Sequence, residues 1–326
     1  MKIRPYNPGD EQQILEMDWL LFPDPWNKRN LDNWRWKHAG NNPAGKAIIY
    51  VMENEGKIIA HFAVVPYRLR VFGENVLASH SIGSMVLPEY QGKGLIKFVA
   101  DKLFEEVMKK RIAFSYGFPN ILAYDLHKKL MGYNDVAQIS TMEKSTSATK
   151  EVLSASNLRA GFLPIQRFDS AVDALWERVK DDHKISVIRD AAFLNWRYLE
   201  RPDQKYYAFG HYEDDSLAGY VILKLYKDAQ IIKGHIVDIL SLSGREDIAL
   251  SLIEASGQFF GRNKADLQSA WVAGSRMYND ILSAQGFRPV RPRPLICRIN
   301  IDKEKYGRVL DGTHWYFTMG DTTEIF

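Results

Sequence analysis

The stretch that decides the fold is Val86-Leu87-Pro88-Glu89-Tyr90-Gln91-Gly92-Lys93-Gly94-Leu95, which runs directly into a helical pattern from Ile96 to Arg111. An apolar β-type segment, Ser84 to Leu87, stops at a proline, and a turn containing two glycines leads into the helix. Such a turn and helix N-terminus point several backbone N–H groups at one place, where they attract an anion. The glycines let a phosphate approach the main chain, because no Cβ stands in the way. The stretch therefore predicts a phosphate-binding loop, with an ordinary glycine-containing βα turn as the alternative.

Length and composition describe a soluble globular protein with room for two domains. The chain has 326 residues, 46% of them hydrophobic and 25% charged, and a net charge of +3. This small charge does not imply a broad nucleic-acid surface. The N-terminus lacks the apolar core of a signal peptide, and no window reaches the ~20 apolar residues that span a bilayer. We therefore expect a cytoplasmic protein with no nucleic-acid or membrane partner.

Two local features narrow the chemistry. Cys297 is the one cysteine, so the sequence predicts neither an intrachain disulfide nor a cysteine-rich metal site. Its strand-like surroundings favour a buried thiol over a nucleophile. The tract from Arg288 to Arg293 is basic and rich in proline, which favours an extended, solvated edge segment, with partner binding as the alternative.

The first 140 residues show the pattern of a meander followed by alternating strands and helices. Asn54-Glu55-Gly56 is a strong hairpin signal between two β-branched segments. The pattern predicts a mixed α/β sheet with helices on its faces. The expected elements are strands at Lys46 to Glu53, Lys57 to Phe72, Val76 to Leu87 and Ile112 to Tyr116, helices from Gly92 to Lys110 and from Asn120, and a strand pair beyond Tyr133.

The second half of the chain repeats the first. Asn33-Trp34-Arg35-Trp36 recurs as Asn195-Trp196-Arg197-Tyr198, and Gly132-Tyr133 recurs as Gly286-Phe287. Two separated anchors at similar offsets indicate an internal duplication, and coincidence is the alternative. Where the first half has its glycine loop, the second half has a single glycine followed by Glu246 and Asp247, which would repel a phosphate. We therefore expect one working site per chain.

The loop resembles the pyrophosphate loop of the GCN5-related N-acetyltransferases (GNAT), whose pattern is Arg/Gln-x-x-Gly-x-Gly/Ala. Gln91, Gly92, Lys93 and Gly94 match the pattern, whereas Ile96 stands where the family prefers glycine or alanine. With Trp34-Arg35-Trp36-Lys37 and Gly117-Phe118-Pro119-Asn120, the first half resembles acetyltransferase-domain proteins found with bacterial surface-polysaccharide genes. The resemblance implies two tandem GNAT-like domains: residues 1–145 with an acyl-CoA site, a linker at 146–160, and a degenerate domain at 161–326.

The resemblance also implies how acetyl-CoA would be held. The pyrophosphate would bind main-chain N–H groups of Gln91 to Leu95, and the pantetheine arm would pair by backbone with Met85, Val86 and Leu87. The N–H of Leu87 or a close neighbour would polarise the thioester carbonyl. Asn120 would open the helix on the far side of the cofactor. The residues implied for the cofactor are therefore Met85, Val86, Leu87, Gln91, Gly92, Lys93, Gly94, Leu95 and Asn120.

The implied reaction is direct attack on the thioester by a small-molecule amine, such as an amino sugar of polysaccharide biosynthesis, with a general base and a general acid. The family often places a tyrosine acid seven residues after the asparagine; here that position is His127, and Tyr124 lies one turn earlier. Tyr124 is our first prediction for the acid and His127 the second. For the base we name His80, because histidine titrates near neutrality; a water relay is the alternative.

Other roles stay open at this point. The tryptophan of the repeated motif is present in both halves, as Trp34 and Trp196, including the half without a cofactor loop, so we interpret both residues as structural. Asp321 is expected to end a strand, with an amine-binding carboxylate as the alternative. A non-catalytic acyl-CoA-binding scaffold and an aminoacyl-tRNA-dependent transferase are the other function classes, and a homodimer is left open.

Overall fold

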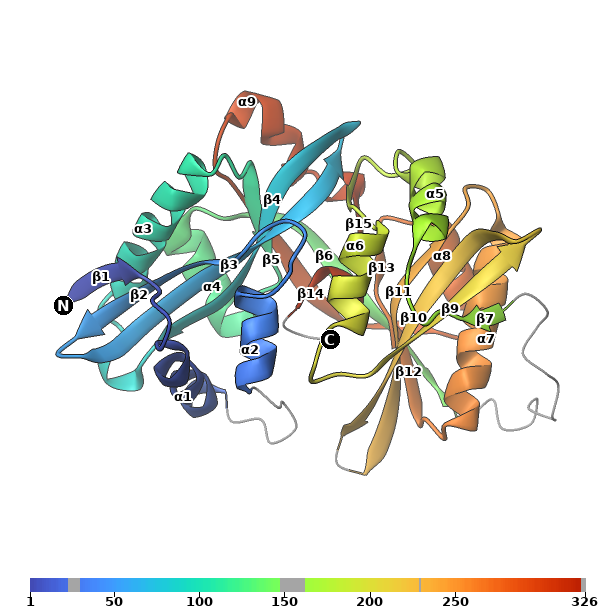
Figure 1. Cartoon of the computed structure of the whole chain (residues 1–326), viewed down its shortest axis with the longest axis horizontal. Helices are drawn as coiled ribbons and strands as arrows, with labels where there is room; N and C mark the ends of the chain where they lie inside the picture. The colour runs from blue at the N-terminus through green and yellow to red at the C-terminus, as the bar shows by residue number, and fades with distance from the viewer. Residues whose placement is uncertain (23–29, 147–161, 229, 324–326) are drawn as a thin grey trace.

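A computed structural model describes residues 1–22, 30–146, 162–228 and 230–323 (Figure 1). Of the linker expected at 146–160, only Thr146 lies within this range. The first half forms the expected hairpin and alternating elements, with the positive-φ residues Glu55 and Gly56 at the hairpin turn. Its elements are β1 (Lys2–Pro5), α1 (Glu11–Leu21), α2 (Leu31–His38), β2 (Ile48–Asn54), β3 (Lys57–Val71), β4 (Glu74–Val86), η1 (Pro88–Tyr90), α3 (Leu95–Lys109), β5 (Phe114–Gly117), α4 (Ile121–Met131) and β6 (Asn134–Ser145).

The second half follows the same plan and then adds a C-terminal segment. Asn195 to Leu199, the repeat of the Trp34 motif, forms a π-helical turn. The elements are β7 (Phe162–Pro164), α5 (Ser170–Val179), β8 (Ile185–Val187), α6 (Ala191–Leu194), η3 (Asn195–Leu199), β9 (Tyr206–Glu213), β10 (Ser216–Asp228), β11 (Ile231–Ser241), α7 (Glu246–Arg262), β12 (Leu267–Ala270), β13 (Val272–Ala273), α8 (Arg276–Ala284), β14 (Arg288–Ile299), α9 (Lys303–Tyr306), η4 (Gly307–Leu310), η5 (Gly312–His314), β15 (Trp315–Thr318) and η6 (Met319–Asp321).

The strands form one mixed sheet, which confirms the predicted α/β class. Strands β1 to β4 pair antiparallel in chain order, and β4 then pairs in parallel with β5. Helix α3 packs on β2 and β3 through a buried stripe that includes Ile96, Val99, Leu103 and Val107. This spacing of three to four residues is the periodicity that predicted the helix from the sequence.

The two halves exchange a strand. β14, from the second half, lies between β5 and β6 of the first half and pairs antiparallel with both. β6 in turn pairs with β12 of the second half. Figure 1 shows β6 and β14 in the centre of the molecule, between the blue-to-green and the yellow-to-orange halves. Each half therefore completes its sheet with a strand of the other.

The repeated tryptophan motifs pack against each other across this junction. The rings of Trp36 and Trp196 stack with centroids 5.2 Å apart, and the Trp36 Nε1 donates to the Trp196 carbonyl at 2.9 Å. Trp34 is also buried and stacks on His38. Trp36 of one copy and Trp196 of the other are thus part of the contact between the halves.

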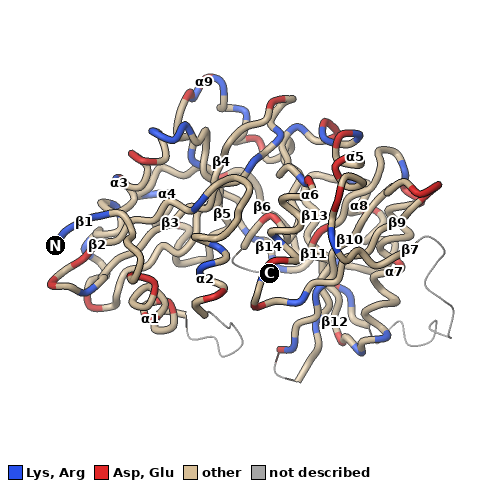
Figure 2. Tube along the Cα trace, viewed as in Figure 1, with Lys and Arg blue, Asp and Glu red and all other residues tan. Residues whose placement is uncertain are grey.

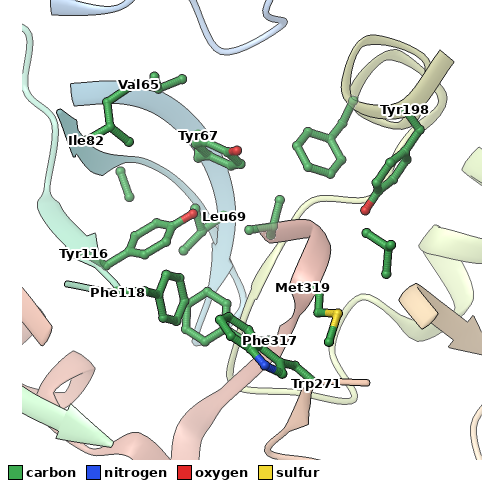
Figure 3. Packing of buried hydrophobic residues seen from close by; sticks show 14 of the residues in the cluster. Val65, Tyr67, Leu69, Ile82, Tyr116, Phe118, Tyr198, Trp271, Phe317 and Met319 are labelled. Atoms are coloured by element: carbon green, nitrogen blue, oxygen red, sulfur yellow. The ribbon is translucent and has the colours of Figure 1, made fainter. Parts of the chain in front are cut away.

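A cluster of buried aromatic side chains also joins the two halves (Figure 3). Phe118, which follows β5, lies 5.3 Å from Phe317 on β15 and 5.6 Å from Trp271, between ring centroids. Tyr116 lies 5.4 Å from Phe317. All four side chains are buried, so the C-terminal strand is an integral part of the core.

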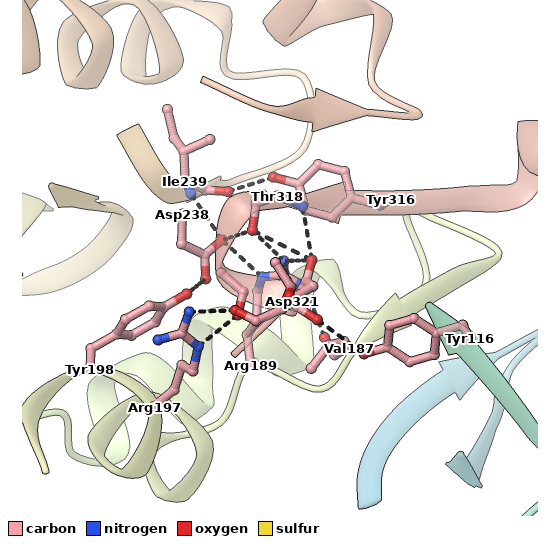
Figure 4. A network of polar contacts seen from close by, with 12 residues as sticks. Tyr116, Val187, Arg189, Arg197, Tyr198, Asp238, Ile239, Tyr316, Thr318 and Asp321 are labelled. Carbon is pink, nitrogen blue, oxygen red and sulfur yellow. Dashed lines mark hydrogen bonds and ion pairs between the residues drawn. The ribbon is translucent and has the colours of Figure 1, made fainter. Parts of the chain in front are cut away.

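A buried ionic network fixes the C-terminal segment against β11 (Figure 4). Arg189 donates to Asp238 at 3.1 Å and to Asp321 at 2.8 Å, and all three side chains are inaccessible to solvent. Burial raises the pKa of Asp321 to about 6, although the Arg189 charge opposes this rise. The Asp321 carboxylate also accepts from the Thr318 N–H, which closes the turn after β15. The structure therefore places Asp321 in this network, as the strand-end residue that the sequence favoured.

The basic tract is extended, as expected. From Arg288 to Pro294 its register partners lie on β6, while β5 pairs only with Ile296 to Ile299, so the tract has a strand on one side only. Cys297 is fully buried, and burial raises the pKa of its thiol. Within the described ranges, no helix is long and apolar enough to cross a membrane.

Candidate active site

The site opens where β4 and β5 separate. Their parallel pairing consists of Ser79 with Ser115 and His80 with Tyr116, and the strands diverge beyond it. A bulge at Gly83 shifts the register of β4 against β3 and bends β4 away. Gly83 has φ +58°, and a Cβ there would lie 3.1 Å from the His61 ring, so the position favours glycine. Because β4 and β5 diverge, a cleft opens between them.

A cleft of about 690 Å³ runs from this opening to the glycine loop. The end of β4, the loop, the start of α3 and one face of α4 form its walls, and the lining is mainly apolar. Its lining residues include Leu21, Phe22, Ser84, Met85, Val86, Gln91, Gly92, Gly94, Leu95, Ile96, Asn120, Ala123, Leu126 and Leu130.

The glycine loop presents main-chain N–H groups to the cleft. Gly92 and Gly94 have φ +75° and +68°, and a Cβ on either would meet no atom within 4 Å, so the space in front of them is open. No side chain caps α3, and its first turn holds no acidic residue. In the described part of the chain, the N–H groups from Gly92 to Ile96 have no hydrogen-bond acceptor. This is a cradle for an anionic group.

Most of the residues predicted for the cofactor line this cleft: Met85, Val86, Gln91, Gly92, Gly94, Leu95 and Asn120. Leu87 and Lys93 do not. The Leu87 N–H donates to the Ile59 carbonyl at 3.0 Å, so it is not available to a thioester. Because N–H groups alternate along a strand, the Val86 N–H faces the opposite edge, toward the cleft. The Lys93 ammonium donates to the Glu89 carbonyl instead.

A second cavity of about 240 Å³ joins the cleft. The two share Phe22, Ser84, Asn120 and Ala123. The other lining residues of the second cavity come from both halves of the chain and are polar or charged at several points. They include Asp18, His80, Ser81, Gly117, Phe118 and His127 from the first half, and Arg293, Ile296 and Thr322 from the second.

The three candidate catalytic side chains are placed differently. His80 and His127 both line the second cavity, and both are buried. The Tyr124 hydroxyl instead donates to Asp135 on β6 at 2.5 Å and lines neither cavity. The α4 residues that line the two cavities are Leu122, Ala123, Leu126, His127 and Leu130, a stripe of helical period that does not include Tyr124. The structure therefore does not bring Tyr124 to the site.

One hydrogen bond determines which ring nitrogen of His127 carries the proton. Its Nδ1 lies 2.7 Å from the Ala123 carbonyl, which can only accept, so Nδ1 carries the proton. Burial lowers the pKa of the ring, and the bond to Ala123 only partly offsets this. The imidazole is therefore neutral at pH 7, with Nε2 as its proton-accepting nitrogen.

In the second half, side chains occupy the region that corresponds to the cleft and glycine loop of the first half. The Tyr316 hydroxyl on β15 donates to the Ile239 carbonyl of β11 at 2.5 Å, and Thr318 donates to Asp238 on the same strand. At the start of α7, Arg245 binds Asp247 and Glu213, so charged side chains occupy the helix N-terminus. Gly244 has φ +69° and open space in front of it, as Gly92 does, but in the described part of the second half charged side chains stand where the first half has Gly94 and Leu95.

Known proteins support this picture of the first half. Residues 2–133 match the family model described as an acetyltransferase (GNAT) domain. No curated protein matches the chain. Among solved structures, a GCN5-related N-acetyltransferase from Anabaena variabilis is 16% identical with a TM-score of 0.69, over 92% of this chain and 73% of that one. A probable N-acyltransferase from Enterococcus faecalis is 15% identical, with a TM-score of 0.67 over 91% and 72% of the two chains.

The N-myristoyltransferase of Saccharomyces cerevisiae, solved with bound myristoyl-CoA, is 12% identical with a TM-score of 0.66, over 92% of this chain and 78% of that one. At these identities the likeness concerns the fold, and it extends over both halves of the chain. Residues 2–133 thus match the acetyltransferase (GNAT) domain, and the chain as a whole has a GNAT-like fold.

Proposed function

We propose that this protein is an acyl-CoA-dependent N-acyltransferase, with acetyl-CoA as donor and a small amine such as an amino sugar as acceptor. The observation that carries the proposal is the continuous path from the glycine cradle, along the cleft, to a second cavity that contains two histidines. A donor with a phosphate at the cradle and a thioester near Ser84 and Asn120 would meet the acceptor where the cavities join.

The open space in front of Gly92 and Gly94 fits a pyrophosphate. An acyl-CoA bound there supplies a thioester, at whose carbonyl carbon an amine forms the amide bond while the C–S bond breaks and the sulfur takes up a proton. The chain's contribution is positioning and proton transfer. The loop N–H groups hold the phosphates, the Val86 N–H polarises the carbonyl, and the apolar walls exclude water.

We assign acceptance of the amine proton to His127. Its Nδ1 is committed to the Ala123 carbonyl, so the neutral ring offers Nε2 as a base. The lowered pKa keeps that base unprotonated at neutral pH. His80 lies on the same cavity, with its ring stacked on Tyr116 at 5.3 Å, and is the alternative base.

The charge distribution does not favour a tRNA-dependent transferase. Lys and Arg are interspersed with Asp and Glu along both halves, as Figure 2 shows. A scaffold that binds acyl-CoA without turnover is separated from the enzyme by measuring acetyl-CoA binding and thiol release together over a panel of amines. Binding with release supports the enzyme, and binding without release supports the scaffold.

Replacing Leu95 by glutamate tests the cradle. The new carboxylate in the first turn of α3 favours the helix but repels a phosphate, as Glu246 does in the second half. We expect the dissociation constant for acetyl-CoA, measured by calorimetry, to rise at least about 10-fold, because one lost charge-assisted contact corresponds to about 1.5 kcal/mol or more.

Met108→Glu is the matched control, since it adds the same charge to an exposed position near the far end of α3. That position is about 20 Å from Leu95 along the helix, beyond the screening length at physiological salt. Unchanged acetyl-CoA binding in Leu95→Glu would remove the cradle from the proposed site.

Replacing His127 by glutamine tests proton transfer. We expect kcat to fall by about 10²- to 10⁴-fold, while acetyl-CoA binding stays the same. In the unaltered enzyme, we expect kcat to decline only at a pH below the one at which an ordinary histidine titrates, because the lowered pKa of His127 keeps the base neutral until then. Tyr124→Phe serves as the control on the same helix, and a loss of kcat in that variant but not in His127→Gln would reverse the assignment.

A further inference from the structure

The basic tract of β14 delivers one arginine to the acceptor cavity. Arg293 and Ile296 both line that cavity, and the register of β14 against β6 shifts between them, where β6 has one extra residue, Val136. Arg293 is not among the residues lining the cleft, so it belongs to the acceptor side. The second half of the chain therefore places a cation in the acceptor pocket of the first.

A fixed aromatic platform holds this guanidinium. Its Cζ lies 5.7 Å from the centroid of the Trp271 ring, within the range of a cation–π contact. Trp271 is fully buried, and its Nε1 donates to the Thr141 hydroxyl at 2.7 Å. Phe118, another lining residue, packs against the same ring. Arg293 is thus positioned before any ligand binds.

The charge of Arg293 has no counter-ion. The side chain is half-buried, and within the described part of the chain it makes no ion pair and no hydrogen bond. Partial burial lowers the pKa of the guanidinium, and no acidic neighbour opposes this. In contrast, the buried Arg189 has two carboxylates, and Arg298 on the same strand donates to the Met131 carbonyl. A partly desolvated, unpaired guanidinium is a ready site for an anion.

A residue of opposite charge also lines this cavity. Asp18 of α1 is also a lining residue, and it lies more than 4 Å from Arg293, since the two form no ion pair. The lining of the cavity therefore includes both signs of charge. Arg293, together with His127 as the proposed base, suits a ligand that carries both an anion and an amine.

We propose that the acceptor is an amine that also bears an anionic oxygen group, a carboxylate or a phosphate, and that Arg293 binds this group. The inference rests on the proposed N-acyltransferase function. It narrows the acceptor from any small amine to one of mixed charge, with the anion held by the second half of the chain.

The test compares matched pairs of amines that differ only in the anion. Glucosamine 6-phosphate is paired with glucosamine, and glycylglycine with its C-terminal amide, each titrated into the full-length protein without acyl donor. We expect at least one anionic member to bind about 10- to 100-fold more tightly than its neutral partner, and Arg293→Gln to abolish this preference. In turnover assays the same variant raises KM for the anionic amine and leaves kcat nearly unchanged.

Arg293→Lys keeps the charge and is expected to retain part of the preference. Arg291→Gln, at an exposed position of the same tract, is expected to behave like the unaltered protein. Equal binding of both members of each pair, or a preference that survives in Arg293→Gln, overturns the proposal. Failure of the unaltered protein to bind acetyl-CoA would instead count against the proposed function, because the paired titrations contain no acyl donor.

Discussion

Replacing Arg189 by methionine lowers the free energy of unfolding by about 3 to 5 kcal/mol, the cost of leaving buried carboxylates without their partner. Arg189, Asp238 and Asp321 are all inaccessible to solvent, so water cannot replace the lost contacts. Because the network holds η6 against β11, the variant also loosens the C-terminal segment. Urea unfolding at pH 7.5, followed by tryptophan fluorescence, measures the effect.

The pH dependence of this variant has a defined sign. Without Arg189, the pKa of the buried Asp321 carboxyl group rises further above its unfolded value, so the folded state binds more protons than the unfolded state. The loss of stability is then largest at high pH and shrinks as the pH falls toward 5. Arg245→Met is the control, since Arg245 also binds two carboxylates but at an exposed site. An equal loss in both variants would show that burial is not the cause.

A fragment ending at Thr146 is expected not to fold on its own. It lacks β14, which pairs with both β5 and β6, and it lacks β12, the other neighbour of β6. β5 would then be left with only two register pairs to β4. We expect the fragment to show no cooperative unfolding transition and no acetyl-CoA binding, measured by circular dichroism and calorimetry.

The complementary fragment, residues 147–326, supplies the missing strands. Producing the two fragments together should restore a cooperative transition and acetyl-CoA binding in a one-to-one complex. If residues 1–146 alone unfolded cooperatively and bound acetyl-CoA as the whole chain does, the strand exchange would not be needed for the stability of the first half. A preparation of residues 147–326 alone completes the comparison.

The sequence predicted those parts of the fold that depend on neighbours along the chain. The hairpin at Glu55-Gly56, the stripe of α3 and the loop at Gly92 to Gly94 all follow from local spacing and from positive φ. The repeated Asn-Trp-Arg motif led to the prediction of two similar halves, and the structure brings Trp36 of one copy against Trp196 of the other.

The parts that the sequence did not predict depend on distant pairing. The proline-rich tract, Arg288 to Arg293, lies at an edge as expected, but the rest of its strand, from Ile296, is inserted in the sheet between β5 and β6. Arg293 gained its place in the acceptor cavity through that insertion, and the spacing of residues gives no signal for it. The unusual density of positive charge beside prolines in the tract from Arg288 to Arg293 was the only hint in the sequence that this segment has a role.

Tyr124 shows a smaller failure of the same kind. A helix residue one position from the stripe of Ala123, Leu126 and His127 turns by about 100° around the axis, which is enough to leave the cavity. Which face of α4 meets the site is decided by where β6 lies, and Asp135 of β6 binds the Tyr124 hydroxyl. The sequence placed the helix but not its rotation.

The strand exchange also sets the order in which the protein is completed during synthesis. β5 ends at Gly117, and its partner β14 begins at Arg288, so about 170 residues separate them. At a synthesis rate of about 5 to 20 residues per second, β5 waits roughly 10 to 30 s for its neighbour. During that interval one edge of β5 is unpaired on the ribosome, open to wrong pairing. The half that contains the glycine loop is synthesised first, but its sheet is completed last.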